Sequence, residues 1–339
     1  FRIAVVGLVH GHVDGFFGQY KDRTDIQVVG IAEADQALAA RYAERYHLDK
    51  SLLFTSVDAM LEKALPQGVV VYTNTFDHRT VVETCAKRGV HVMMEKPLAV
   101  SNAHAKAMAT AAAEGKIQVL VNYETTWYAS NRAAFDLVAE NALGEVRKIV
   151  VHDGHFGPRE IGCGEDFLKW LTDPALNGAG ALFDFGCYGA DLATWILEGQ
   201  RPMSVFAVTR QIKPDVYPKV DDEATIVVMY PKAQVIIQAS WNWPFSRKDM
   251  EVYGQHGSVV TVGDKQVRVR KRGEDAEKTL AAKALSGVEA DPISYFRAVV
   301  MDGLKPSGLS SLETNLVVTE ILDAARESAR TGKRVVLSP

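Results

Sequence analysis

The chain of 339 residues exceeds the length that one hydrophobic core usually supports, so we expect two domains. With 47% hydrophobic and 24% charged residues, its composition is that of a globular protein and excludes a disordered or membrane-embedded one. Its 38 basic and 42 acidic residues are interspersed, and the net charge of −4 argues against nucleic acid as a partner.

The first third of the chain alternates short β-rich runs with helical patterns, which is typical of βαβ units and a parallel sheet. The expected strands are residues 2–6, 27–32, 68–72, 91–94 and 118–122. The expected helices are residues 36–46, 57–63, 79–88 and 102–114. Nearly continuous apolar runs indicate strands that are buried on both faces. We therefore predict an α/β N-terminal Rossmann domain over residues 1–122.

After residue 122 the pattern changes to strands that follow one another with no helix between them. The expected elements are helices at 132–141 and 184–197, a strand at 149–156, and strands at 204–209, 224–230, 234–241, 249–253 and 266–271. Helices at 292–301 and 312–331 and a short strand close the chain. Strands joined by short turns indicate antiparallel pairing. Residues 123–339 are thus predicted to form an α+β C-terminal domain with a large, mainly antiparallel open sheet.

The turn after the first strand reads Gly7-Leu8-Val9-His10-Gly11-His12 and leads into a helix. In a Rossmann unit, glycines at such a turn let the backbone approach a pyrophosphate at the helix N-terminus. Only Gly7 stands at its expected position, because Val9 and His12 replace the second and third glycines of the fingerprint. A turn of this kind is as often an ordinary loop. We expect Gly7, Val9, His10, Gly11 and His12 to lie at a cofactor, with His10 and His12 near its phosphate or the substrate.

Glu33 ends the second strand, where an acidic residue binds the adenosine ribose in Rossmann domains. Its charge repels the additional phosphate of NADP, so NAD is the expected cofactor and NADP the less favoured one. Arg41 and Arg45 on the next helix are the counter-argument, although such arginines are more often solvated.

The segment 89–99 predicts a strand that ends in Glu95-Lys96-Pro97 at the carboxyl edge of the parallel sheet, where ligands bind in open α/β folds. Read alone, a Glu-Lys pair is most often a solvated surface pair. With this motif, however, the chain resembles the Gfo/Idh/MocA family of oxidoreductases. The resemblance covers nearly the whole chain, and the turn after the first strand is where the sequence departs from the family pattern. Its further motifs are Thr73-Asn74-Thr75 with His78, residues 141–145, residues 184–191, residues 220–223 and residues 331–333.

The resemblance implies which residues bind the cofactor and which do chemistry. Thr73, Asn74, His78, Glu95 and Lys96 are expected at the cofactor. Lys96 is also expected to be catalytic, together with two residues of the second domain. These are Asp184 and Tyr188, whose spacing places them on one helix face.

We expect Tyr188 to be the acid/base, Lys96 to polarise the substrate oxygen, and Asp184 to orient the substrate or the lysine. An unperturbed tyrosine ionises near pH ~10, so Tyr188 needs an ammonium such as Lys96 nearby to lower its pKa. Two alternatives stay open at this point. Asp184 can be only a helix N-cap, and Tyr188 can be only a core aromatic residue.

Other residues are weaker candidates for the site. Tyr123, His155 and Trp170 are expected to contact the substrate. Asp191 either orients the substrate or only forms hydrogen bonds within its helix. The aromatic run 241–245 can stack on a sugar or build a subunit interface. No metal site is expected.

Together these observations predict an NAD(P)-dependent oxidoreductase that transfers a hydride at a hydroxyl carbon of a sugar, cyclitol or related polyol. One alternative is a glycosidase that oxidises its sugar transiently, and another is a non-catalytic NAD-binding sensor or scaffold. By resemblance, we expect a homodimer or homotetramer formed through the C-terminal sheet. No membrane span or signal peptide is visible, and three scattered cysteines favour a reduced, cytoplasmic location. The start at Phe1 without a methionine leaves open a removed leader.

Overall fold

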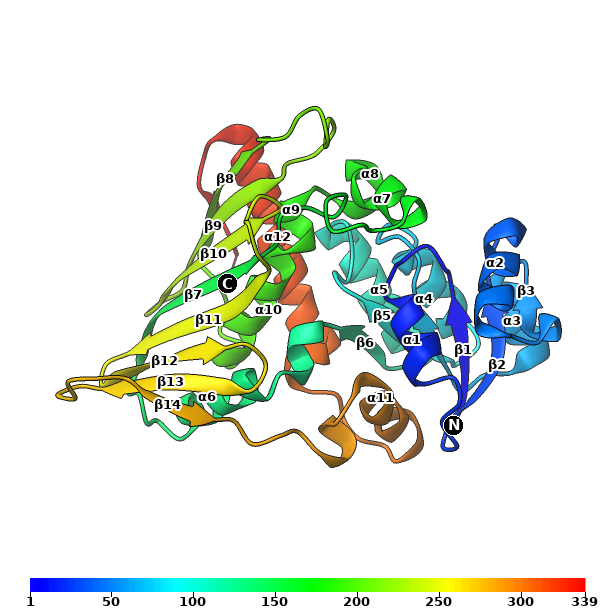
Figure 1. Cartoon of the computed structure of the whole chain (residues 1–339), viewed down its shortest axis with the longest axis horizontal. Coiled ribbons are helices and arrows are strands. Elements are labelled where there is room, and N and C mark those ends of the chain that lie inside the picture. The colour runs from blue at the N-terminus through cyan, green and yellow to red at the C-terminus, as the bar shows by residue number, and fades with distance from the viewer. Residues whose placement is uncertain (339) are drawn as a thin grey trace.

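Two β-sheets organise the chain, as seen in a computed structural model that describes residues 1–338 (Figure 1). The first sheet is parallel, in the order β3-β2-β1-β4-β5-β6. Its strands are β1 (Arg2–Val6), β2 (Gln27–Ala32), β3 (Leu53–Phe54), β4 (Gly68–Val71), β5 (His91–Glu95) and β6 (Val119–Asn122). This confirms the predicted Rossmann architecture; β3, with two residues, was too short to be predicted.

Five helices cover both faces of the first sheet. They are α1 (Val13–Gln19), α2 (Gln36–Tyr46), α3 (Val57–Ala64), α4 (His78–Ala86) and α5 (Asn102–Gly115). Ile3 and Val5 of β1 pack with α1 and α2, whereas Ala4 and Val6 belong to the core that contains α3, α4 and α5. Alternate residues of one strand therefore enter two different cores, which explains the continuous apolar runs. Side chains of Asp35, Ser56 and Ser101 cap α2, α3 and α5.

The second sheet has nine strands in the order β14-β13-β12-β11-β7-β10-β9-β8-β15. The strands are β7 (Val146–Gly154), β8 (Ser204–Arg210), β9 (Glu223–Met229), β10 (Gln234–Ser240), β11 (Arg247–Gly254), β12 (Gly257–Val262), β13 (Gln266–Lys271), β14 (Lys278–Ala281) and β15 (Val335–Val336). All neighbours pair antiparallel except β7 and β10, so the mainly antiparallel prediction is confirmed. The prediction missed β14, which is exposed at every residue, and β12, which buries three residues in succession. Neither strand has the alternation that marks a half-buried strand.

The helices of the second half are α6 (Ala129–Ala139), α7 (Glu165–Leu171), α8 (Pro174–Asn177), α9 (Ala181–Asp184), α10 (Gly186–Ile196), α11 (Pro292–Met301) and α12 (Leu312–Thr331). The predicted helix 184–197 was wrong at its start, because it is two helices that break at Phe185. No helix within residues 1–338 combines the length and the apolar character that crossing a membrane requires.

Two of these helices join the halves of the molecule. Figure 1 shows α10 and α12 between the second sheet and the Rossmann sheet; α12 contacts both β8 and α5. Before α12 in the chain, α11 returns to the first sheet, where the Phe296 ring meets the Phe1 ring edge to face with 5.4 Å between their centroids. The edge of the first sheet that carries the predicted motifs is therefore held against the second half of the chain.

Candidate active site

The turn after β1 is shaped by Gly7 and Glu33. Gly7 has a φ of 80°, and a side chain there would approach the backbone nitrogen of Thr73 to 2.8 Å, so the position requires glycine. Glu33 is buried, and its two carboxylate oxygens accept hydrogen bonds from Leu8 N at 2.8 Å and Asp35 N at 2.9 Å. The carboxylate thus holds the turn against the end of β2, and each oxygen keeps a lone pair for a further donor.

His12 and Glu95 form one side of a cleft at this edge. His12 Nδ1 lies 3.0 Å from Glu95 Oε2, and Asn122 Nδ2 donates to Glu95 Oε1 at 2.9 Å. Trp127 Nε1 in turn donates to Asn122 Oδ1 at 2.9 Å. Burial alone would raise the pKa of Glu95, but His12, Asn122 and Lys96 lower it below its usual value. Glu95 therefore stays ionised inside the protein.

The cleft beside these residues has a volume of about 380 Å³. Side chains added at Gly11 or Gly15 would meet no atom within 4 Å, so the start of α1 leaves open space. The open helix start and the ionised Glu95 fit a bound nicotinamide cofactor. The lining residues that carry polar or aromatic groups are His12, Phe16, Gln19, Tyr20, Tyr72, Glu95, Asn122, Glu124 and Trp127.

His10 and Val9 lie under α7 instead of in this cleft. The His10 ring meets Phe167 edge to face at 4.8 Å, and Trp170 Nε1 donates to Val9 O at 3.2 Å. The indole N–H of Trp170, a predicted substrate contact, is therefore hydrogen-bonded to the turn after β1.

The tautomer of His10 follows from its contacts. His10 Nδ1 accepts from His12 N at 3.2 Å, and burial lowers the pKa of His10 well below its usual value, so the ring is neutral with its proton on Nε2. This buried donor has no partner within residues 1–338, and it suits an acceptor oxygen of a bound ligand. His10, His12 and Glu95 stand close enough to share a metal ion, but a protonated Nε2 cannot be a ligand.

Thr73, Asn74 and His78 build the edge rather than face its cleft. Thr73 Oγ1 donates to Asn74 O at 3.0 Å, and Asn74 Oδ1 accepts from Asp77 N at 3.0 Å at the start of α4. His78 is buried and donates from Nδ1 to Leu98 O at 3.2 Å, which fixes the segment that follows Lys96. Burial lowers the pKa of His78 to about 4, so this histidine is neutral.

Lys96 and Asp184 form a buried pair between the two halves of the chain. Lys96 Nζ lies 2.5 Å from Asp184 Oδ1 and also donates to Asp184 O at 3.1 Å, and both side chains are 7% exposed. Burial lowers the pKa of Lys96, but the Asp184 carboxylate outweighs it and raises the pKa above its usual value. Burial likewise opposes ionisation of Asp184, and Lys96 more than compensates, so its pKa is lowered. Both groups are charged at neutral pH.

Asp184 does not act as a helix N-cap, as its position in the sequence had suggested. It is the last residue of α9, and its carboxylate binds Lys96 and the indole of Trp241. The N-cap residue of α10 is Phe185, and no side chain caps this helix.

Tyr188 lies beside this pair in α10, although Asp184 and Tyr188 do not share one helix as the i,i+4 spacing had predicted. Its ring centroid is 5.1 Å from Lys96 Nζ and 4.8 Å from Lys248 Nζ. The expected lowering of its pKa was wrong, because burial raises the pKa of Tyr188 well above its usual value and Glu124 adds to that effect. The tyrosine therefore keeps its proton at neutral pH.

The remaining predicted contacts divide between core and site. Tyr123 is fully buried; its hydroxyl donates to Asn315 Oδ1 at 2.9 Å, and its ring packs on Tyr188 at 5.4 Å. Its hydroxyl is thus turned toward α12 and away from Lys96. His155 follows β7, and its ring meets the Phe185 ring edge to face at 4.8 Å. Burial lowers the pKa of His155, and the charge of Asp184 opposes this lowering.

Sequence reasoning missed Asp153, Lys248 and Glu124. Asp153 and Lys248 are direct cross-strand neighbours on β7 and β11, and Lys248 is ion-paired with Glu124 from the first half of the chain. Asp153 is fully buried, and neither carboxylate oxygen has a hydrogen-bond partner within residues 1–338. The signal was present in the sequence: positions 149, 151 and 153 share the inward face of one strand, and an acid there is unexpected.

Asp191 is a second buried acid without a partner. It lies in α10, fully buried, and burial raises its pKa well above its usual value, as it does for Asp153. The proposed hydrogen bonds within its helix are not formed by its side chain. Burial therefore disfavours the charged form of both acids.

Family descriptions match both halves of the chain. Residues 1–123 match the oxidoreductase family with an NAD-binding Rossmann fold, and residues 131–260 match the GFO/IDH/MocA C-terminal domain. Among curated relatives, trans-1,2-dihydrobenzene-1,2-diol dehydrogenase of Xenopus tropicalis is 24% identical over 313 residues, covering 89% of each chain. The 1,5-anhydro-D-fructose reductase of Ensifer adhaerens is also 24% identical and covers 87% of this chain and 88% of its own.

Solved structures share the same architecture. An aldose-aldose oxidoreductase from Caulobacter crescentus, complexed with glycerol, aligns with a TM-score of 0.83 at 22% identity and covers 99% of both chains. An inositol dehydrogenase homolog from Azotobacter vinelandii, complexed with NAD⁺, aligns with a TM-score of 0.83 at 18% identity and covers 99% of this chain and 97% of its own. At these identities the likeness establishes the fold alone.

Proposed function

Because this chain belongs to the Gfo/Idh/MocA family of NAD-binding oxidoreductases, we propose that it transfers a hydride at a hydroxyl carbon of a sugar, cyclitol or related polyol. The observation that carries the proposal is the buried pair of Lys96 and Asp184, 2.5 Å apart, beside Tyr188. A fixed cation next to a phenol that keeps its proton suits an oxygen whose negative charge grows during reaction. The named relatives act on a dihydrodiol and an anhydrofructose, which supports this substrate class.

We assign roles from the charge state of each group. The Lys96 ammonium donates a hydrogen bond to the substrate oxygen and stabilises negative charge on it. Tyr188 gives its hydroxyl proton to that oxygen when a carbonyl is reduced to an alcohol and regains a proton from solvent; in the reverse direction Tyr188 first loses its proton to solvent, and the tyrosinate accepts the proton of the alcohol. Asp184 holds Lys96 in place. When bound, NAD supplies the hydride acceptor, or its reduced form supplies the hydride.

The cofactor is assigned to the carboxyl edge of the first sheet. Gly11 and His12 would hold its phosphates at the start of α1, and Glu33 its adenosine ribose. Glu95 would receive a hydroxyl hydrogen bond of the second ribose, and His10 Nε2 would donate to an acceptor of the cofactor or the substrate. We place the boundary with the substrate domain after residue 122, where β6 ends.

We further propose a homodimer or homotetramer formed through the second sheet. Its helices cover one face, and the opposite face exposes large apolar side chains. They are Phe206, Val208, Tyr253 and Val262. Sedimentation velocity at micromolar concentration checks this, and a monomer would contradict it.

We propose a cytoplasmic location, in keeping with three unpaired cysteines.

The test is NADH fluorescence during incubation with NAD and a panel of myo-inositol, aldoses, anhydrohexitols, sugar acids and cyclic trans-diols. Aryl glycosides and NADP are run in parallel. We expect NADH from NAD with one polyol class. Release of an aglycone without net NADH would instead identify a glycosidase, and silence with every compound despite NAD binding would identify a non-catalytic sensor or scaffold.

A further inference from the structure

Trp241, the residue after β10, lies directly behind Asp184 and is fully buried. Its indole Nε1 donates a hydrogen bond to Asp184 Oδ2 at 2.9 Å, while Asp184 Oδ1 faces Lys96 Nζ at 2.5 Å. The two oxygens of one carboxylate are thus held by donors from the two halves of the chain. A carboxylate with a donor on each oxygen has a defined rotation, so the direction in which it faces Lys96 depends on the indole.

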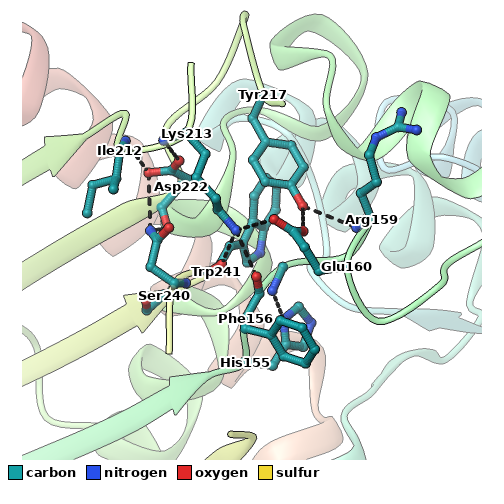
Figure 2. A network of polar contacts seen from close by, with 12 residues as sticks. His155, Phe156, Arg159, Glu160, Ile212, Lys213, Tyr217, Asp222, Ser240 and Trp241 are labelled. Atoms are coloured by element: carbon teal, nitrogen blue, oxygen red, sulfur yellow. Dashed lines mark hydrogen bonds and ion pairs between the residues drawn. The ribbon is translucent and has the colours of Figure 1, made fainter. Parts of the chain in front are cut away.

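Trp241 is itself held in place through its main chain and its ring, and Figure 2 shows the residues around it. The backbone nitrogen of Trp241 donates to Asp222 O at 2.8 Å, and its carbonyl accepts from Lys213 Nζ at 2.7 Å. The Tyr217 ring lies 4.9 Å from the indole. The position of the N–H group is therefore set before any ligand binds.

The same cluster reaches the segment that follows β7. Lys213 Nζ binds Glu160 Oε1 at 2.5 Å and Phe156 O at 2.7 Å, and the Tyr217 hydroxyl donates to Glu160. This segment leads into α7, which packs on the turn after β1. The residues that hold Trp241 are thus connected, through this segment and α7, to the turn after β1.

We propose that Trp241 is a positioning residue, which holds the Asp184 carboxylate in the orientation that pairs with Lys96. The proposal rests on the function proposed above, in which Lys96 binds the substrate oxygen. Lys96 is itself donor to both the carboxylate and the backbone carbonyl of Asp184, so a rotation of that residue moves the ammonium. Trp241 acts through Asp184, because the only N–H group of its indole donates to the Asp184 carboxylate.

The substitution Trp241→Phe removes the N–H group and keeps an aromatic ring. With NAD and the polyol that the wild-type enzyme oxidises fastest in the panel, we expect kcat to fall about tenfold to a hundredfold, as for other groups that orient a catalytic residue. The KM for NAD should change less than twofold. The acidic limb of the pH profile should move to higher pH, because the charged form of Asp184 loses a hydrogen bond. The other groups near Asp184 that titrate or carry charge are Lys96, His155, Cys163, Cys187 and Tyr188.

A double-mutant cycle separates positioning from a merely structural role. If Trp241 acts through Asp184, adding Trp241→Phe to Asp184→Asn should change kcat less than twofold further. The matched control is Trp195→Phe, which removes an indole stacked on Phe135 at the far end of α10 and should leave kcat and the pH profile unchanged. An unmoved pH profile in Trp241→Phe, or fully additive losses in the cycle, would overturn the proposal.

A second variant covers the case in which Trp241→Phe fails to fold. Lys213→Met keeps the indole but removes the ammonium that binds the backbone carbonyl of Trp241. We expect a smaller loss of kcat than in Trp241→Phe, with the same shift of the acidic limb. Wild-type kinetics in Lys213→Met would remove the supporting cluster from the proposal. Failure of the proposed function is seen separately, because it would leave Lys96→Met active. An inactive Lys96→Met beside an unaffected Trp241→Phe would overturn only the positioning role.

Discussion

Buried acids are paired differently on the two sides of the proposed active site. On the cofactor side, Glu33 accepts two backbone hydrogen bonds and Glu95 is held by His12 and Asn122. On the substrate side Asp184 is paired with Lys96, whereas two fully buried carboxyl groups have no partner within residues 1–338. These two are Asp153 and Asp191. The carboxylates of the cofactor side are thus paired in the free protein, while the substrate side keeps two buried carboxyl groups without a partner.

The largest expected effect tests the buried pair of Lys96 and Asp184. Lys96→Met keeps most of the length of the side chain and removes its charge. We expect turnover to fall about a thousandfold or more, because the developing oxyanion loses its main electrostatic partner. NAD affinity, measured by fluorescence titration, should change less than threefold.

The control for Lys96→Met is Lys232→Met, which removes a lysine from an exposed pair with Glu145 and should behave as wild type. A Lys96→Met enzyme with near-normal turnover would remove Lys96 from the chemistry. A circular dichroism spectrum and a thermal melt check that the unpaired Asp184 has not unfolded the protein.

A smaller effect is expected on the cofactor side. Glu95→Gln keeps the shape of the side chain and removes its charge, so His12 loses its anionic partner. We expect the KM for NAD to rise about tenfold and kcat to fall less than that, since a binding contact is weakened more than a transition-state contact. If kcat falls by orders of magnitude while the KM for NAD is constant, Glu95 belongs with the substrate side and the comparison fails.

Much of this arrangement was predictable from the sequence, because periodicity and resemblance both report on local structure. The two sheets followed from apolar runs, and the pairing of Lys96 with Asp184 was implied by the family motif. The role of Trp241 was not predictable, since its contact to Asp184 joins residues 57 positions apart on different elements. Burial also decided the protonation of Tyr188, and burial depends on the whole fold. The break at Phe185 was missed because the run on either side of it is helical.

Asp153 allows the unpaired acids to be tested through stability. Burial raises its folded-state pKa well above its usual value, so its contribution to stability is complete below the unfolded pKa of about 3.9 and is lost as the pH rises toward the folded pKa. Asp153→Asn removes this loss. We expect its Tm to exceed that of the wild type by about 2–6 °C at pH 8 and to match it near pH 4.

The matched control for Asp153→Asn is Asp249→Asn on the neighbouring strand. Asp249 is paired with Arg247 and its folded-state pKa is lowered, so its stabilising effect is present at neutral pH and is lost as the pH falls. Differential scanning calorimetry across pH 4–8 should therefore give opposite signs for the two variants. A Tm that falls at pH 8 in Asp153→Asn would mean that the carboxyl group is ionised and paired in solution.

The smallest expected effect concerns Glu33, because its carboxylate already accepts two backbone hydrogen bonds in the free protein. Glu33→Gln keeps an oxygen that can accept from Leu8 N and removes the charge that repels the additional phosphate of NADP. We expect the KM for NAD to rise about threefold, near 0.6 kcal/mol, and the ratio of NADP to NAD turnover to rise about fivefold. The exposed acid Glu313→Gln serves as the control. If NADP turnover is unchanged while the thermal stability falls, Glu33 only holds the turn after β1 and does not recognise the ribose.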